Sequence, residues 1–201
     1  MKNELVIKHN DLIEARYTLS LVEQKVILFA ITKIDTSKEK LNKVRFNVNE
    51  LAELIGSESS RYSEFRIIAN NLMDKRIYLK DRPMLEIRWA SRSEYIGNGV
   101  IELGFDEELI PYLLQLKSRF TRYQIRNILY LENKHSIRIY ELMKQYQSIG
   151  KREFEVEELK RILMIEGQYE RFYDFERYVL EKTKQEINEN TDILITYDKL
   201  K

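Results

Sequence analysis

The sequence predicts an α+β fold in which one arrangement of helices and strands occurs twice, as two tandem domains related by internal duplication. Three observations lead to this prediction. Apolar residues recur at helix spacing and at strand spacing in the same order in both halves of the chain. Glycine (6) and proline (2) are scarce among the 201 residues, which favours regular structure with short connections. Hydrophobic residues make up 43% of the chain, enough for a sizeable core.

The first half is expected to contain a buried helix after Ser20. Ser20 and Glu23 can form a capping box, in which each side chain bonds the backbone amide of the other, and an apolar run follows. Asn98-Gly99 is the strongest hairpin signal in the chain, since both residues tolerate the backbone of a tight turn. The elements expected in this half are a helix at 20–35, a strand at 44–48, helices at 49–55 and 60–75, a small antiparallel sheet at 77–105 and a helix at 106–116.

The second half repeats this order after a helix that is expected to begin at Thr121. Its further expected elements are a helix at 136–148, a strand at 153–156, helices at 157–163 and 171–190, and a strand at 193–197. Four apolar residues match at an offset of 108, namely Phe46, Val48, Leu51 and Ile55 with Phe154, Val156, Leu159 and Leu163. Because element order and spacing agree, duplication explains the matches better than chance does.

The repeated unit is typical of a winged helix: a helix, a short strand, two helices joined by a brief turn, and a β-hairpin. The second helix of the pair can lie in the major groove of DNA, and the hairpin, or wing, lies beside it and can touch the DNA backbone. We therefore expect an N-terminal winged-helix domain at 1–118 and a C-terminal winged-helix domain at 119–201, which together can follow one face of a duplex.

The net charge of +1 gives no overall attraction to DNA, but the basic residues are unevenly distributed. Residues 117–152 hold nine basic and two acidic residues, a local charge of +7, whereas residues 153–201 carry −5. A patch of one sign between two winged helices suits phosphate contacts, although a charge run more often marks a solvated helix face. The candidates for DNA contact in this patch are Arg119, Arg122, Arg126, Arg138, Lys144, Lys151 and Arg152.

The amphipathic helix at 171–190 is the candidate for insertion into the major groove, because Arg, Lys and Asn can hydrogen-bond to base edges. Its apolar face is expected to consist of Phe172, Phe175, Val179, Thr183 and Ile187, and its opposite face of Tyr173, Arg177, Glu181, Lys184 and Asn188. The same spacing fits an ordinary exposed helix with an Arg177–Glu181 pair equally well. The acidity of residues 153–201 counts against DNA contact.

The composition argues against several other classes of protein. The chain has no cysteine, which excludes disulfides and thiolate metal sites and fits a reducing, cytoplasmic location. The two histidines, His9 and His135, lack the spacing of metal ligands, and His135 is more typical of a solvated histidine at a helix start than of a phosphate donor. The longest apolar run, 26–31, is too short to span a membrane. We expect a protein that is not an enzyme and has no metal or cofactor.

Several blocks of the sequence resemble one known family. The blocks NDLIEARYTLSLVEQK at 10–25, LLQLKSRFTRY at 113–123 and SIRIYELMKQY at 136–146 are similar to the signature of the initiator replication (Rep) proteins of theta-replicating, iteron-containing plasmids. The run from Phe175 to Leu180, followed by Glu186-Ile187-Asn188 and Thr191-Asp192-Ile193, completes the pattern. Four blocks in the family's order cover nearly the whole chain, which makes the resemblance specific.

This resemblance implies a plasmid replication initiator that binds directly repeated origin sites (iterons) in double-stranded DNA. The second domain would bind the major groove, and the first would contact the adjacent backbone or minor groove and form a homodimer interface. Family monomers help open the origin and load host replication proteins, and dimers typically repress their own promoter. Family members usually continue past the equivalent of Lys201, so we expect an incomplete second wing with only its first strand.

The resemblance also assigns roles to residues of this chain. Arg177 and Lys184 are the expected base or nearby contacts. The expected phosphate contacts are Arg119, Arg122, Arg126, Arg138 and Lys144, although Arg138 could instead be structural.

Three other functions fit parts of the sequence. A tandem winged-helix transcriptional regulator would share the fold and would bind a palindrome at a promoter rather than repeats in an origin. A protein-interaction module is compatible with the acidic segment 153–201. A metal-dependent nuclease has the least support, because the carboxylates form no D-x-D or E-x-x-H cluster.

Overall fold

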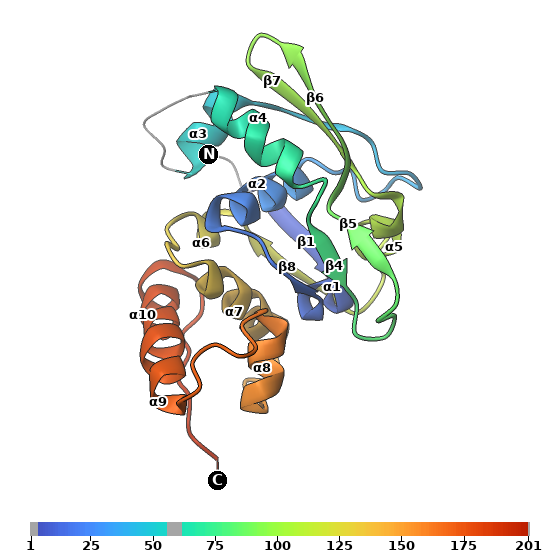
Figure 1. Cartoon of the computed structure of the whole chain (residues 1–201). Helices are drawn as coiled ribbons and strands as arrows, with labels where there is room; N and C mark the ends of the chain where they lie inside the picture. The colour runs from blue at the N-terminus through green and yellow to red at the C-terminus, as the bar shows by residue number, and fades with distance from the viewer. Residues whose placement is uncertain (1–3, 56–61, 201) are drawn as a thin grey trace.

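The computed structural model describes residues 4–55 and 62–200 (Figure 1). The first half of the chain forms β1 (Leu5–His9), α1 (Asn10–Glu14), β2 (Arg16–Tyr17), α2 (Leu21–Thr32), β3 (Val44–Asn47), α3 (Val48–Ile55), α4 (Tyr62–Asn71), β4 (Arg76–Tyr78), β5 (Glu86–Arg88), β6 (Ala90–Gly97) and β7 (Val100–Phe105). The long β6–β7 hairpin and the α3–α4 helix pair make up the upper part of the molecule in Figure 1. These are the parts of a winged helix.

The second half forms η1 (Glu107–Leu109), α5 (Ile110–Leu113), β8 (Phe120–Gln124), α6 (Arg126–Leu129), α7 (Lys134–Gln145), α8 (Val156–Ile162), α9 (Phe172–Phe175), the π-helical segment η2 (Glu176–Leu180) and α10 (Glu181–Asn190). The last three elements run without a break from residue 172 to residue 190, and we call them the α9–α10 helix. This long helix confirms the helix predicted at 171–190. It packs beside α7 in the lower part of the molecule (Figure 1).

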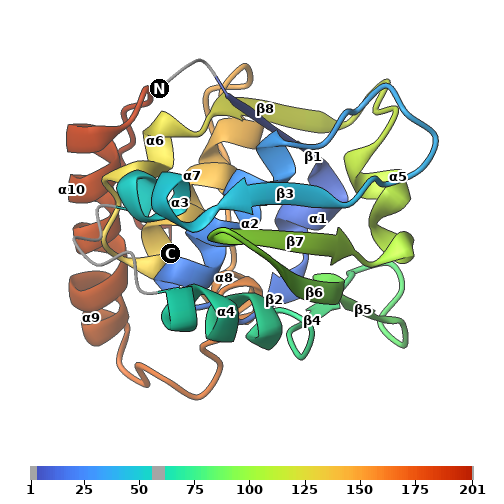
Figure 2. The same ribbon diagram turned by 90° about the horizontal axis from the view of Figure 1, so that it is seen from above.

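Helix α2 is the centre of the first half, and it begins with the predicted capping box. Ser20 Oγ accepts from the Glu23 amide at 3.2 Å, and the Glu23 carboxylate accepts from the Ser20 amide at 2.7 Å. Every residue from Glu23 to Ile31 is buried. Phe29 packs edge-to-face against Phe46 of β3, with ring centroids 6.1 Å apart, so that the sheet containing β3 and β7 rests on α2 (Figure 2).

The strands predicted at 77–105 belong to two sheets rather than one. β4 lies between β2 and β5, and β7 lies between β3 and β6. The chain passes from one sheet to the other at Trp89, which is fully buried and packs edge-to-face against Tyr17 with centroids 5.0 Å apart. The hairpin prediction is confirmed, because Asn98 and Gly99 adopt positive φ angles of 52° and 73° between β6 and β7.

The helix predicted from Thr121 is wrong at its start, because residues 120–124 form strand β8. Its side chains are alternately exposed and buried, and β8 pairs antiparallel with β1, with Lys8 opposite Thr121. The strands predicted at 153–156 and 193–197 are also wrong, since neither segment pairs with a strand of the described chain. Val156 already begins α8, and the backbone of Ile195 bonds to the Asn188 side chain instead.

The structure preserves the helices of the predicted repeat. α3 begins at Val48 and α8 at Val156, which reproduces the offset of 108 residues, and α4 and α9 begin 110 residues apart. The strand of the repeat is not preserved, because Phe46 lies buried in β3 whereas Phe154 lies partly buried in a loop under the Arg152 guanidinium. Residues 56–61, which connect α3 and α4 in the sequence, lie outside the described residues.

The two halves are joined by strand pairing and helix packing. The predicted boundary between residues 118 and 119 falls just before β8, whose partner is the first strand of the chain. Helix α7 packs against α1 and α2 of the first half and against α10 of the second. The last helix pair is therefore mounted on the first half through α7.

A buried ionic cluster fixes α7 in this position. Lys8 of β1 and Glu141 of α7 form a salt bridge at 2.7 Å, and both side chains are at most 1% exposed. The Tyr123 hydroxyl donates to Glu141 at 2.6 Å, and Arg138 lies 3.4 Å from the same carboxylate. Burial raises the pKa of Glu141, but Lys8, Arg138 and the hydrogen bonds outweigh this effect and lower the pKa below its ordinary value of 4.5.

We predict that Glu141→Gln lowers the free energy of unfolding by about 3–5 kcal/mol, because it leaves the charge of Lys8 buried without its counter-ion. The carboxylate stabilises the fold above its ordinary pKa of 4.5, and this contribution is lost as the pH falls through the lowered folded-state pKa. The difference between wild type and variant in urea unfolding should therefore narrow below pH 4.5. Glu39→Gln, at an exposed position, is the control and should unfold like wild type. Equal stability of the Glu141 variant would contradict the prediction.

Candidate nucleic-acid interface

The α9–α10 helix is anchored by one buried face, largely as predicted. Phe175, Val179, Thr183 and Ile187 are each at most 1% exposed. Phe172, at the helix start, was predicted on the same face but is exposed. These four buried residues follow one another at intervals of four. The π-helical segment explains this interval, because it adds one residue to a turn between Phe175 and the rest of the helix.

The same segment changes which polar residues face outward. Before it, Tyr173 is exposed, as predicted. Beyond it, Lys182 and Gln185 are exposed, whereas the predicted Lys184 and Asn188 are half-buried. Glu181 is still exposed as predicted, but after it the outward positions have moved by one residue along the chain. An analysis that assumes a uniform helical period cannot detect this shift.

Lys184 and Asn188 are engaged within the protein, which corrects their predicted exposure. The Asn188 side chain accepts from the Ile195 amide at 2.7 Å and donates to the Ile195 carbonyl at 3.0 Å. Lys184 forms an ion pair with Glu181 at 2.7 Å and lies over the ring of Tyr197. These contacts fasten the segment after the helix against the helix itself.

The outward surface of the helix is basic and aromatic. Tyr173, Arg177, Tyr178 and Lys182 are all exposed, and Arg177 lies 3.5 Å from the Tyr173 hydroxyl. Arg177 and Lys182 each lie within 6 Å of the Tyr178 ring centroid, at 5.6 and 5.8 Å. Neither cation has an acidic partner in the described chain. Lys182 was missed from the sequence, where its i,i+4 spacing from Tyr178 is the available signal.

Most acidic residues of the helix are bound by partners in the same molecule. They are Asp174, bound by Arg171 at 2.7 Å; Glu176, bound by Lys199 at 2.7 Å; Glu181, bound by Lys184 at 2.7 Å; and Glu186, bound by the amides of Glu132 and Asn133 at 3.1 and 3.2 Å. The net acidity of this region therefore does not describe its outward surface, on which Arg177 and Lys182 remain available to a polyanion.

The basic residues of the junction that were predicted to contact DNA fall into two groups. Four of them are exposed around β8, α6 and the loop after α7, namely Arg119, Arg122, Arg126 and Lys151. Arg119 also pairs with Asp11 at 2.8 Å. The other predicted cations are largely buried in internal ion pairs, with Lys144 bound to Asp192 and Arg152 bound to Glu14, both at 2.6 Å.

Arg138 lies in the core, which rules out the predicted phosphate contact and agrees with the structural role that was its alternative. Its guanidinium donates to the carbonyl oxygens of Ile13 at 3.0 Å and Ala15 at 2.7 Å, and it lies 3.9 Å from the Tyr17 ring centroid. At 4% exposure it has no access to a ligand. The charge count of the junction could not reveal this, because a charge count contains no information about depth.

His135 is buried as well, at the start of α7. Burial and the nearby Lys134 lower its pKa to about 4, so the imidazole is neutral at pH 7. A solvated histidine was the expectation here, and the structure shows a buried one. Helix α7 begins at Lys134 rather than at the predicted residue 136, and Asn133 caps it.

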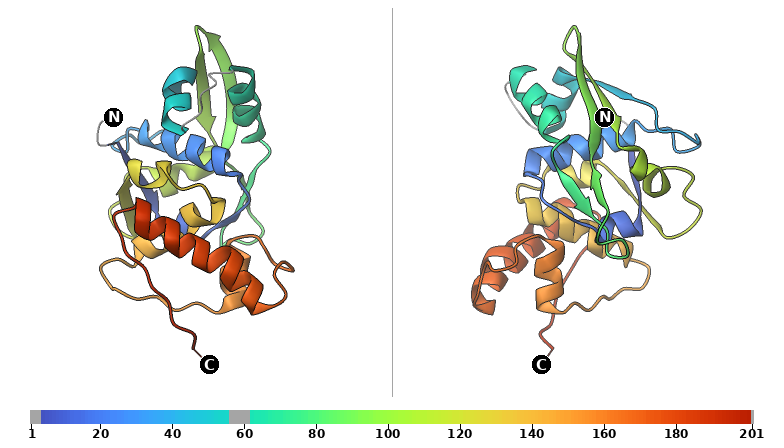
Figure 3. Two further views of the ribbon diagram at one scale, coloured as in Figure 1. Left: turned by 90° about the vertical axis from the view of Figure 1, so that its left-hand side faces the viewer. Right: turned by 45° about the vertical axis from the view of Figure 1, so that its right-hand side comes forward.

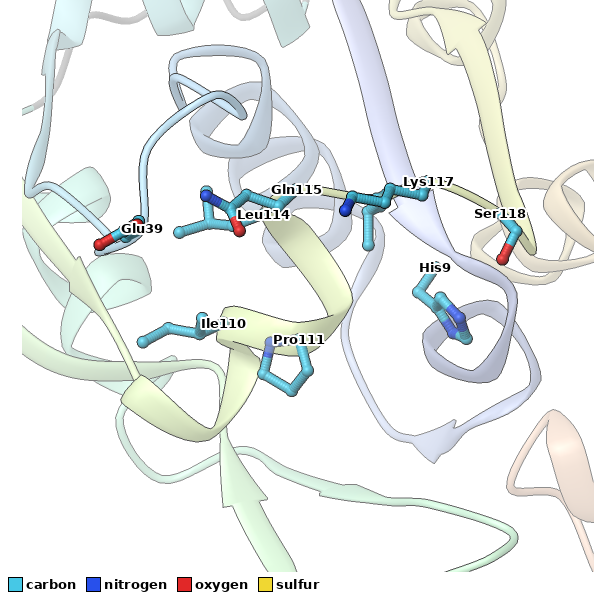
Figure 4. A pocket seen from close by; sticks show the side chains of 9 residues that line it. His9, Glu39, Ile110, Pro111, Leu114, Gln115, Lys117 and Ser118 are labelled. Carbon is cyan, nitrogen blue, oxygen red and sulfur yellow. The ribbon is translucent and has the colours of Figure 1, made fainter.

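An open depression of about 360 Å³ lies near α5 and the end of β1 (Figure 4). Figure 4 shows His9 and Lys117 toward one end and Glu39 at the other, with Ile110 and Pro111 forming an apolar edge. Charges of both signs and the open shape give it no defined ligand preference. Within residues 4–55 and 62–200, no group of three or more metal-ligating side chains occurs, and no helix is long and apolar enough to cross a membrane.

Comparison with known proteins accounts for both halves of the chain. Residues 5–144 match the family described as Initiator Replication protein, WH1, and residues 155–201 match Initiator Rep protein, WH2. The chain belongs to the initiator replication protein family. Its two winged-helix domains confirm the predicted fold class. The WH1 match extends across residue 118, in line with the pairing of β8 and β1.

Individual proteins that are similar to the chain are distant from it in sequence. A replication initiation protein of Escherichia coli is 28% identical over 213 residues, which cover 99% of this chain and 66% of that protein. An uncharacterized 27.6 kDa protein of Escherichia coli is 32% identical over 102 residues, covering 50% of this chain and 43% of that protein. The chain thus spans less than two thirds of the length of either relative.

A solved initiator structure has the same fold. The crystal structure of the Pi initiator protein in complex with iteron DNA matches with a TM-score of 0.79 at 24% identity, covering 96% of this chain and 89% of that one. In the left view of Figure 3 the α9–α10 helix lies across the front of the molecule, α3 and α4 lie above it, and α6 lies between them. Both winged helices of this chain therefore contribute helices to one side of the molecule.

We predict that the imidazole of His135 titrates with a midpoint of about 4 rather than near 6.5. Because folding lowers the pKa of this base, its protonation is disfavoured in the folded state, and it carries no charge at neutral pH. An NMR titration of the imidazole proton resonances, with a His135→Gln variant to assign them, measures the midpoint. A midpoint near 6.5 would contradict the burial described above.

Proposed function

We propose that the chain is a plasmid replication initiator that binds directly repeated sites (iterons) in double-stranded DNA through its two winged-helix domains. One observation carries the proposal: the outward surface of the α9–α10 helix presents Arg177 and Lys182 beside exposed tyrosines, while most of its acids are bound internally. Membership of the initiator family and the likeness to a protein crystallised with iteron DNA support it.

In this proposal the α9–α10 helix enters the major groove. Arg177 and Lys182 are long donors that can reach guanine or phosphate oxygens, and Tyr173 can hydrogen-bond beside them. The exposed cations Arg119, Arg122, Arg126 and Lys151 would contact phosphates and fix the register of the protein on the duplex. Lys184, Asn188, Lys144 and Arg152 would support these contacts from behind, through their internal bonds.

We further propose the division of labour that the family resemblance implies. The domain at 1–118 would contact the adjacent DNA backbone and form a homodimer, and the domain at 119–201 would read the origin repeats. The monomer would help open the origin and load host replication proteins in the cytoplasm, and the dimer would repress its own promoter. The lack of cysteine in the chain fits that reducing compartment.

We predict salt-dependent, sequence-specific binding to duplex DNA. The full chain is titrated with a duplex carrying the repeats next to its gene and with a scrambled duplex of equal length, at several salt concentrations. The logarithm of the affinity should fall linearly with the logarithm of the salt concentration, because phosphate contacts release condensed cations. Equal affinity for both duplexes would defeat specific binding, and a flat salt dependence would defeat the assigned phosphate contacts.

We predict that Arg177→Ala weakens binding to the specific duplex by about 1–3 kcal/mol and has a smaller effect on the scrambled duplex, as expected for a base contact. Lys182→Ala should weaken specific binding too, although the sequence pattern did not select Lys182. Arg82→Ala removes an exposed arginine from the turn between β4 and β5, on the opposite side of the molecule in Figure 1, and should bind like wild type. An equal loss on both duplexes would assign Arg177 to the phosphate contacts.

A further inference from the structure

The connection between α6 and α7, taken with the helix-end residues 129 and 134, is hydrogen-bonded by two side chains of the first half. The Lys25 ammonium of α2 donates to the Leu129 carbonyl at 2.6 Å, and the Gln24 side chain donates to the Lys134 carbonyl at 3.0 Å. Lys25 and Gln24 are at most 5% exposed, so these bonds form in a region with little access to water. The buried donors have few other partners, which favours a defined geometry for these bonds.

The α9–α10 helix binds the same connection through the backbone amides of the connection. The carboxylate of Glu186, in the α9–α10 helix, accepts from the Glu132 amide at 3.1 Å and from the Asn133 amide at 3.2 Å. Hydrogen bonds to a charged acceptor are stronger than bonds between neutral groups. Carbonyl groups of residues 129–134 therefore bond the first half while amide groups bond the helix proposed to enter the groove. We call residues 129–134 the strut.

We infer that Glu186 is a positioning residue, which acts through the strut to fix the distance and rotation between the two DNA-contacting halves, and so sets the spacing of the DNA site that the chain accepts. This inference rests on the proposed function. A sequence-based interpretation would count Glu186 as a negative charge that opposes DNA binding. In the structure its carboxylate is instead bound to two backbone amides of the strut.

The spacing of a DNA site is a demanding geometric property. Each inserted base pair moves the two contact regions apart by about 3.4 Å and rotates them by about 35°, since one turn holds about 10.5 base pairs. A chain with a rigid strut must lose contacts in one half when a base pair is inserted. A chain with a loosened strut can follow the displaced site.

Ion pairs on the α8 side also link the two halves and could hold them without the strut. Arg152 binds Glu14 at 2.6 Å, whereas Lys80–Glu158 and Arg16–Glu166, at 3.0 and 3.9 Å, are more exposed. Exposed pairs contribute little rigidity. Helix α7 packs against α1, α2 and α10 and so already joins the halves. The bonds of Glu186 to the strut add a second attachment beside this packing, which constrains the rotation of the α9–α10 helix about α7.

The test compares wild type, Glu186→Ala and Glu186→Gln on duplexes selected by the full wild-type chain from a randomised library, and on the same duplexes with one base pair inserted between the two protected regions. Wild type should bind the inserted site about tenfold or more weakly, the order of one lost base contact. Glu186→Ala should reduce this ratio to about threefold or less, whereas Glu186→Gln, which keeps an acceptor oxygen, should retain most of it.

The matched control is Glu189→Ala, which removes an exposed acid of the same helix whose only bond in the described chain is to Gln185. It should leave the spacing ratio unchanged. If Glu186→Ala fails to fold, Gln24→Ala loosens the strut from the other half and should lower the ratio in the same way. An unchanged ratio in a folded Glu186→Ala protein overturns the inference, even where wild type binds specifically. If wild type selects no duplex, the proposed function itself has failed.

A second readout needs no DNA. Amide hydrogen exchange at Glu132 and Asn133 should be faster in Glu186→Ala than in wild type, because the carboxylate that accepts from both amides is gone. Exchange at the same amides should stay at the wild-type rate in Glu189→Ala. Equal protection in all three proteins would show that the strut does not depend on Glu186.

Discussion

Helix α7 carries the second helix pair, and the ion pair between its Glu141 and Lys8 of β1 fixes α7. The cluster draws on four separate elements, because Tyr17 comes from β2, Tyr123 from β8 and Arg138 from α7. A buried ion pair is a costly way to gain stability, but it is demanding in geometry, since a misplaced partner leaves a bare charge in the core. The pairing of β1 with β8 and the docking of α7 therefore depend on each other.

On this foundation the protein sorts its charges by depth. Internal bonds that hold the halves together engage Lys8, Arg138 and Arg152. The exposed surface of the last long helix carries Arg177 and Lys182. The acids of that helix are similarly divided, with most of them turned onto internal partners. A chain with almost no net charge can in this way present a local cationic surface, which is the property that contact with a polyanion requires.

Features that depend on neighbours in sequence could be predicted, and features that depend on distant partners could not. The capping box at Ser20 and the hairpin at Asn98-Gly99 are local, and both formed as predicted. Strand β8 was missed because its partner is the first strand of the chain, far away in sequence. The role of Arg138 stayed open between a phosphate contact and a structural one, because its acceptors are distant carbonyl groups of α1 and its C-terminal cap. The core face of the α9–α10 helix was predicted almost completely. Its outward face was predicted correctly as far as Glu181, but Lys184 and Asn188, beyond the π-helical segment, are half-buried.

Because of that π-helical segment, a change in chain length can alter which residues share the outward face of the helix, without the replacement of any outward residue. In a regular α-helix each residue advances by about 100°, so deletion of one residue between 176 and 180 would turn the start of the helix relative to its end by about that angle. Tyr173 and Lys182 would then no longer share a face. Length variation at this point of the backbone offers related chains a route to new DNA targets that is separate from the exchange of contacting side chains.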